Sequence, residues 1–259
     1  MRKERLDVNK VFYYELRRTV CSRFFVGLTA IMLWYGRQIL STSTILGVAH
    51  TAPFSPWSFG SYLASLMPLL NVSLLFFLWN QCNHKARQVE ALVITSSAHP
   101  GQYLLIKCCA AAAAWLISAL LAISLGVGFL LNLFGPAVSV AQLMAPAALV
   151  LLPSLVFVLG TGLLVGRMHS GLLFAMMAVV FGWGFVPVPA AADLYGQNLF
   201  TRYPLTLPNL DPAFTVPPEA VIGSCLFILA GICALAVCVH KFQSCSTRLL
   251  SRQILQYTV

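Results

Sequence analysis

With 259 residues, of which 59% are hydrophobic and 9% charged, the chain is far more apolar than a soluble domain of this length, in which about 25% of residues are charged. Its apolar residues come in blocks of about 20, the length at which a helix crosses the hydrocarbon core of a bilayer. Such continuous blocks exclude a transmembrane barrel, whose strands alternate apolar and polar residues over about 10 positions. The composition therefore predicts an all-α integral membrane protein.

Residues 1–23 predict an amphipathic helix that lies in the membrane interface. Seven of these residues are basic, as is typical of a helix that rests on anionic lipid. On a helical wheel one side carries Val8, Val11, Phe12, Leu16 and Val20. Glu15 and Thr19 interrupt this apolar side. The segment is predicted to lead into the first membrane span.

Six apolar blocks follow and predict a bundle of six transmembrane helices within residues 24–240. They are Phe24 to about Leu46, Phe59–Trp79, Cys108–Leu131, Leu143–Val165, Ser170–Val188 and Val221–Val239. The second and fourth blocks contain prolines, which predict kinks because neighbouring helices can satisfy the freed backbone groups. Two connections are long, a cytoplasmic loop at 80–102 and an outer loop at 189–219. Residues 241–259 form a basic tail.

The distribution of Lys and Arg predicts that both chain ends lie in the cytoplasm. Fourteen of the 16 basic residues lie in 1–23, in 80–107, at 167 or in the tail, all on one side of the predicted bundle. Arg202 lies on the opposite side and Arg37 within the first apolar block. This is the asymmetry of the positive-inside rule. We therefore interpret the net charge of +9 as topology signals and contacts with anionic lipid, and we expect no nucleic-acid partner.

Several kinds of chemistry are missing from the sequence. All seven acidic residues lie outside the apolar blocks, whereas a proton-coupled transporter needs an ionisable group at membrane depth. No His-Glu-x-x-His motif, Cys-x-x-Cys pair or paired aspartates occur, so we expect neither a catalytic residue nor a metal site. The chain also lacks Gly-x-x-x-x-Gly-Lys-[Ser/Thr], so ATP-driven movement would require a separate subunit.

The segment 84–107 reads HKARQVEALVITSSAHPGQYLLIK. It resembles the first cytoplasmic loop of type 2 ATP-binding-cassette (ABC) permeases, in which a charged helix with a Glu leads through leucines and a Ser/Thr–Pro turn to a Lys. The matching positions are Arg87, Glu90, Leu92, Ser96, Pro100, Tyr103 and Lys107. The usual Gly-Thr-Leu run after the Glu is absent, and Pro100 comes late. The predicted architecture resembles that family over nearly the whole chain.

The resemblance implies a permease subunit of an ABC exporter in a bacterial plasma membrane. It would work as a dimer with a second copy or a related chain. The chain would hold no cofactor, because ATP and Mg²⁺ would bind to a partner ATPase subunit. Residues 84–100 would form the coupling helix that enters this partner. The residues expected to make the coupling contacts are Arg87, Glu90, Leu92, Val93 and Pro100.

Spans one, two and five are the candidates for lining a translocation path. Their candidate residues are Arg37, Asn71, Ser73 and Trp183. Arg37 lies about 21 Å beyond Arg23 along a helix, a depth from which an arginine can also extend to the headgroups. An apolar interior would suit an amphipathic, lipid-like or peptide cargo. A non-transporting scaffold or sensor and an ion-coupled transporter stay open as other classes.

Overall fold

The computed structural model describes the backbone of residues 8–83, 86, 88, 100–186, 188–189 and 192–257. Side chains are described for the same residues except Pro100 and 242–257. The chain is 82% helical and has no strand among the residues described. The main helices are α1 (Val8–Val20), α2 (Arg23–Thr42), α3 (Pro56–Cys82), α5 (Pro100–Phe134), α6 (Val140–Met168), α7 (Leu172–Trp183), α8 (Gln197–Arg202) and α9 (Pro218–Tyr257).

Four of these helices are long and apolar enough to cross a membrane. They cover Pro56–Cys82, Gly101–Ala137, Val140–Met168 and Pro218–Lys241. A fifth crossing results if α1 and α2, which meet at a bend of 60°, are counted as one span. The described helices are therefore those of a multi-pass membrane protein. The predicted fifth span contains only the 12-residue α7, shorter than the about 20 residues that a straight crossing needs, so the number six stays a prediction.

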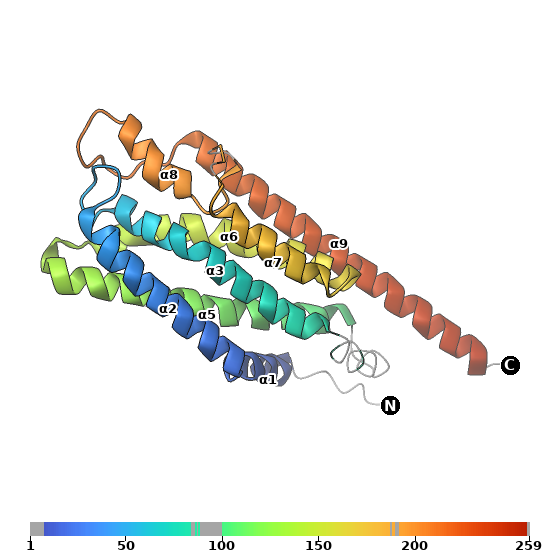
Figure 1. Cartoon of the computed structure of the whole chain (residues 1–259). Coiled ribbons are helices and arrows are strands. Elements are labelled where there is room, and N and C mark those ends of the chain that lie inside the picture. The colour runs from blue at the N-terminus through green and yellow to red at the C-terminus, as the bar shows by residue number, and fades with distance from the viewer. Residues whose placement is uncertain are drawn as a thin grey trace.

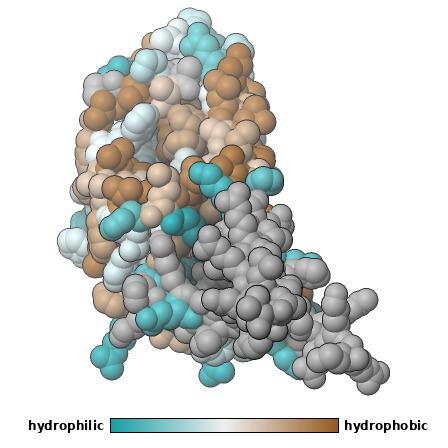
Figure 2. Space-filling model, turned by 90° about the vertical axis from the view of Figure 1, so that its right-hand side faces the viewer, coloured by the Kyte–Doolittle hydropathy of each residue, from teal (hydrophilic) through white to brown (hydrophobic). Residues whose placement is uncertain are grey.

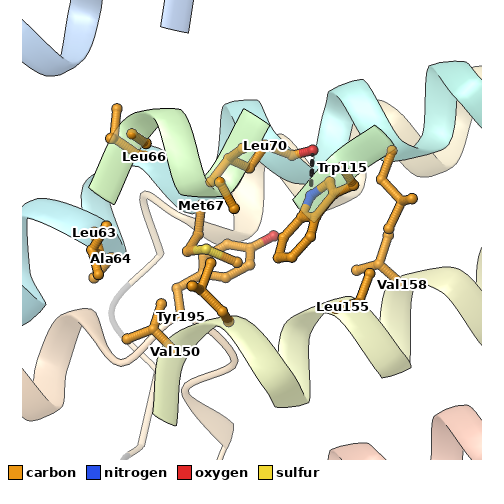
Figure 3. Close-up of a cluster of buried hydrophobic side chains, with 14 of the residues drawn as sticks. Leu63, Ala64, Leu66, Met67, Leu70, Trp115, Val150, Leu155, Val158 and Tyr195 are labelled. Atoms are coloured by element: carbon orange, nitrogen blue, oxygen red, sulfur yellow. Dashed lines mark hydrogen bonds between the residues drawn. The ribbon is translucent and has the colours of Figure 1, made fainter. Parts of the chain in front are cut away.

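Helix α3 lies at the centre of the bundle and contacts α2, α5, α6, α7 and α8 (Figure 1). Its most apolar stretch is 78% buried, because apolar residues occupy all of its sides and not a single stripe. Tyr62 of α3 donates a hydrogen bond to the carbonyl of Ala122 at 2.9 Å. In return, Trp115 of α5 donates to the carbonyl of Leu70, also at 2.9 Å (Figure 3). These two bonds fix α5 against α3.

Helices α6 and α9 approach each other at a pair of glycines. A Cβ atom built on Gly160 would lie 2.2 Å from the carbonyl oxygen of Gly231, and one built on Gly231 would lie 2.3 Å from that of Val156. The two backbones are thus in direct contact, as is common where small residues let membrane helices come close. Past this contact α9 continues along the bundle and ends on the side where α1 lies (Figure 1).

The N-terminal helix packs against α5, and the polar residues that interrupt its apolar side are buried next to Leu16 and Val20, which are partly buried against the core. Glu15 and Thr19 are the buried residues of α1, whereas Val8 is 48% exposed. The interruption noted in the sequence therefore marks the surface that faces the protein. Ser22 then ends the segment, because its hydroxyl accepts a hydrogen bond from the backbone N–H of Phe25 and caps α2. The predicted position of α1 in the membrane interface stays a prediction.

Candidate functional site

A groove of about 800 Å³ lies between α2 and the pair α7 and α8. Helix α3 forms its floor, because both α2 and α7 pack on α3. The walls carry the aromatic side chains of Trp34, Tyr35, Phe181 and Phe185. Polar groups line the remainder, namely Ser61, Ser65, Gln197, Asn198, Thr201 and Arg202. The groove thus combines apolar walls with hydrogen-bonding groups and one guanidinium.

The wall from α7 is set by a close approach to a proline. Pro68 lies within α3, and a Cβ atom built on Gly184 would lie 2.4 Å from its Cγ atom. Only a glycine lets the end of α7 come this close to α3. Pro68 and Gly184 both line the groove, so this contact defines its inner edge.

The wall from α8 is held by the carboxylate of Asp193. Its Oδ1 accepts a hydrogen bond from the backbone N–H of Gly196 at 2.9 Å, and its Oδ2 accepts one from that of Asn198 at 2.6 Å. Such bonds satisfy backbone donors that a helix start leaves without partners. Burial raises the pKa of the Asp193 carboxyl, although the backbone N–H donors act in the opposite direction. The side chain of Asn198 in turn donates to the carbonyl of Val188 at 2.8 Å.

Tyr195 and Phe200 anchor the segment between α7 and α9 in the core. Tyr195 is 1% exposed, lies beside Met67 and Val150 (Figure 3), and donates a hydrogen bond to the carbonyl of Val180 at 2.7 Å. Phe200 is fully buried and its ring packs on Gly60 of α3. The connection between α7 and α9 is therefore part of the bundle and positions the polar side chains of α8 at the groove.

The four residues predicted for a translocation path do not line this groove. Arg37 and Trp183 are exposed, on α2 and at the end of α7. Asn71 is buried and donates a hydrogen bond to the hydroxyl of Ser154 on α6 at 2.6 Å. Ser73 is buried and donates to the carbonyl of Leu70 in its own helix at 2.7 Å. Asn71 thus joins α3 to α6, whereas the hydrogen bond of Ser73 lies within α3.

The predicted coupling residues fall mostly in a part of the chain that is not described. Arg87, Glu90, Leu92 and Val93 lie outside the described residues, and Pro100 is the first residue of α5. Sequence reasoning did not identify Ser61 and Ser65 as lining a groove. Their spacing of four residues within an apolar block was a usable signal, because it places both on one face of a helix.

The groove has the chemistry of a binding site. Within the described portion of the chain, no group of three or more His, Cys, Asp or Glu side chains could hold a metal ion. The side chains identified at the groove offer hydrogen bonds and aromatic surface. An amphipathic molecule could place its apolar part against the aromatic walls and its polar part near Thr201 and Arg202.

Comparison with known proteins finds no matching family model, no matching curated protein and no matching solved structure.

Proposed function

We propose that this chain is the membrane-spanning permease subunit of an ABC exporter in a bacterial plasma membrane. It would form half of the translocation path and be driven by a separate ATPase subunit. The observation that supports this most is the groove, whose walls and floor come from α2, α3 and α7. These helices correspond to the first, second and fifth predicted spans, which the sequence indicated as the lining of a path. The resemblance of residues 84–107 to a coupling loop adds independent support.

The connection between coupling segment and groove is direct along α3. This helix ends at Cys82, next to the segment 84–100, and it forms the groove floor from Ser61 to Leu69. The 13 residues from Leu69 to Cys82 span roughly 20 Å of rigid helix. Closure of the ATPase on ATP would push residues 84–100, and α3 would carry the displacement to the groove. In a dimer the second permease subunit would supply the opposite half of the path.

The groove also suggests the class of cargo. Its aromatic walls and its hydroxyl, amide and guanidinium groups fit a molecule with an apolar body and a polar or anionic head. With both chain ends in the cytoplasm, α8 and Arg202 would lie near the outer surface. A lipid-like or amphipathic cargo could enter from the membrane and leave at that surface.

The first test is whether an ATPase accompanies the chain. A C-terminally tagged chain would be purified in mild detergent, and ATP hydrolysis would be measured on the co-purified material. We expect a P-loop protein whose activity falls at least about fivefold in the double variant Glu90→Ala and Leu92→Ala, because loss of interface contacts of 1–2 kcal/mol weakens the complex. The exposed Gln142→Ala is the control. Recovery of the chain alone, without hydrolysis, would favour a scaffold or sensor.

The second test concerns the groove. Ser65→Trp would fill part of its floor, whereas Ser124→Trp places the same ring on an exposed position of α5. The complex would be reconstituted in liposomes with a fluorescent phosphatidylethanolamine as an amphipathic probe. We expect ATP-dependent movement of the probe in wild type and Ser124→Trp, and a loss of about tenfold in Ser65→Trp, since a blocked path removes binding worth about 1.4 kcal/mol or more. Equal movement in both variants would exclude the groove as the path.

A further inference from the structure

A second groove, of about 670 Å³, lies between α1 and the first turns of α5. Helix α1 contributes Lys10, Tyr14, Glu15 and Arg18, and α5 contributes Tyr103 and Lys107. Three of these six side chains are cationic and one is anionic. Figure 2 views the bundle from the right-hand side of Figure 1, and hydrophilic residues lie across the lower part of this face, at the height of α1 in Figure 1.

Lys107 is the most unusual of these residues because it is only 5% exposed. Its ammonium group lies 4.7 Å from the centroid of the Tyr103 ring, a cation–π contact. Its carbonyl accepts a hydrogen bond from Gln81 of α3 at 3.3 Å, which fixes the backbone at this position. A buried ammonium group requires compensation by opposite charge or hydrogen bonds. The face of the Tyr103 ring supplies part of this compensation.

Glu15 supplies negative charge to the groove, but its carboxylate also faces the guanidinium of Arg18. The residue is 6% exposed, and one of its carboxylate oxygens lies 3.9 Å from Nη1 of Arg18. The side chain of Arg18 is itself 52% exposed, so much of its guanidinium faces outward. Among the described residues that line the groove, one carboxylate thus stands beside three cationic side chains, so the charge of this lining is net positive.

We propose that this groove binds the phosphate headgroup of an anionic phospholipid. The phosphate would lie between Arg18 and Lys107, and Val11 and Tyr14 would contact the glycerol and the upper acyl chains. A lipid is favoured over a soluble phosphate because α5, which forms one wall, is a membrane-crossing helix from Gly101 onward. The groove thus lies where a span begins, the level of the headgroups. Basic pockets between helices at this level are suited to anionic headgroups.

Binding of a lipid here would hold α1 against α5. The proposal does not depend on the transport function, since it rests on the residues of α1 and α5 alone. It assigns to the buried Glu15 a role in positioning Arg18 rather than in proton transfer.

The test measures lipid binding to the delipidated full chain in non-ionic detergent by native mass spectrometry. Phosphatidylglycerol, phosphatidylcholine and inorganic phosphate are the three probes. We expect phosphatidylglycerol to bind more tightly than phosphatidylcholine. Arg18→Gln and Lys107→Gln should each weaken its binding about fivefold, the effect of removing one basic residue near an anionic headgroup. Lys107→Arg, which keeps the charge, should retain most of the binding.

Lys241→Gln is the matched control, because Lys241 is exposed and lies outside the groove. Three results would overturn the proposal. They are equal affinity for the two phospholipids, an equal loss in Lys241→Gln, and competition by inorganic phosphate at the same concentration as the lipid. The last would identify a soluble phosphate as the ligand. If Lys107→Gln does not fold, Arg18→Gln still tests the proposal. About half of the Arg18 side chain is exposed, so its replacement should disturb folding less.

Discussion

Replacement of Gly231 by leucine is expected to lower the free energy of unfolding by about 3 kcal/mol, the upper part of the usual range for overpacking. A Cβ atom at this position would lie 2.3 Å from the carbonyl oxygen of Val156. The obstacle is backbone, which cannot rotate away as a side chain would. The facing Gly160 has the same constraint, since its Cβ atom would lie 2.2 Å from the carbonyl oxygen of Gly231. Helices α6 and α9 would therefore have to separate.

The measurement is unfolding of the purified chain in detergent, followed by circular dichroism against temperature or added dodecyl sulfate. Gly128→Leu is the matched control, because a Cβ atom built there meets nothing within 4 Å. That variant is expected to be as stable as wild type or slightly more so, since a helix interior gains about 0.5–1 kcal/mol when glycine is replaced by a better helix former. If both variants unfold at the same temperature, the backbones of α6 and α9 are not in direct contact at Gly231.

Replacement of Phe200 by alanine is expected to cost about 3–5 kcal/mol, as for other fully buried phenylalanines. Phe200 is 0% exposed. Its ring stacks on that of Phe214, with centroids 6.3 Å apart, and meets the edge of Trp57 at 6.2 Å. It also fills the space above Gly60. Since Phe200 lies in α8, its loss would free the helix that carries the polar wall of the groove.

Two readouts separate this local loss from global unfolding. One is the unfolding free energy of the purified chain, and the other is the rate at which an added protease cleaves residues 189–219. Phe200→Ala should raise that rate, whereas Phe185→Ala should leave it near wild type because Phe185 is 69% exposed. An unchanged rate in Phe200→Ala would show that the aromatic cluster does not hold this segment.

The anchoring of α8 bears on the proposed transport function as well. Asn198, Thr201 and Arg202 reach the groove only if Asp193 holds the start of α8 and Phe200 holds its middle. Partial loss of transport in Phe200→Ala, with ATP hydrolysis retained, would agree with a path along the groove. The basic groove at α1 would be unaffected by this variant, so the two sites can be tested separately.

The helices themselves were largely predictable from the sequence. The apolar blocks at 59–79 and 143–165 are the centres of α3 and α6, which extend them to Pro56–Cys82 and Val140–Met168. The extra turns are less apolar and were therefore missed. The block at 170–188 was expected to be one span, but α7 ends at Trp183, where Gly184 meets Pro68. That contact joins residues far apart in the sequence, so hydropathy along the chain could not reveal it.

The residues of the groove were less predictable than its helices. Asn71 and Ser73 are polar residues of the second predicted span and were predicted to line a path. Both are instead buried at the centre of the bundle, where each donates a hydrogen bond. Ser61 and Ser65 are equally polar and line the groove. The rotation of α3 about its axis, set by all of its neighbours, decides that Asn71 faces α6 while Ser61 and Ser65 face the groove. A helix that is apolar on every side does not encode this rotation in its own pattern.

The class of protein and the position of its apolar segments could be predicted from the amino-acid pattern, because the free energy of placing a block in lipid depends mainly on the residues of that block. The tertiary structure decided which surfaces meet. Gly231 is one of several glycines in the sequence, and only the packing of α9 on α6 distinguishes it from Gly128. Glu15 is an irregularity in an amphipathic pattern, and the contact of α1 with α5 buries it at the groove that Lys107 also lines. Such contacts join distant parts of the chain, so their energies depend on geometry that no local pattern contains.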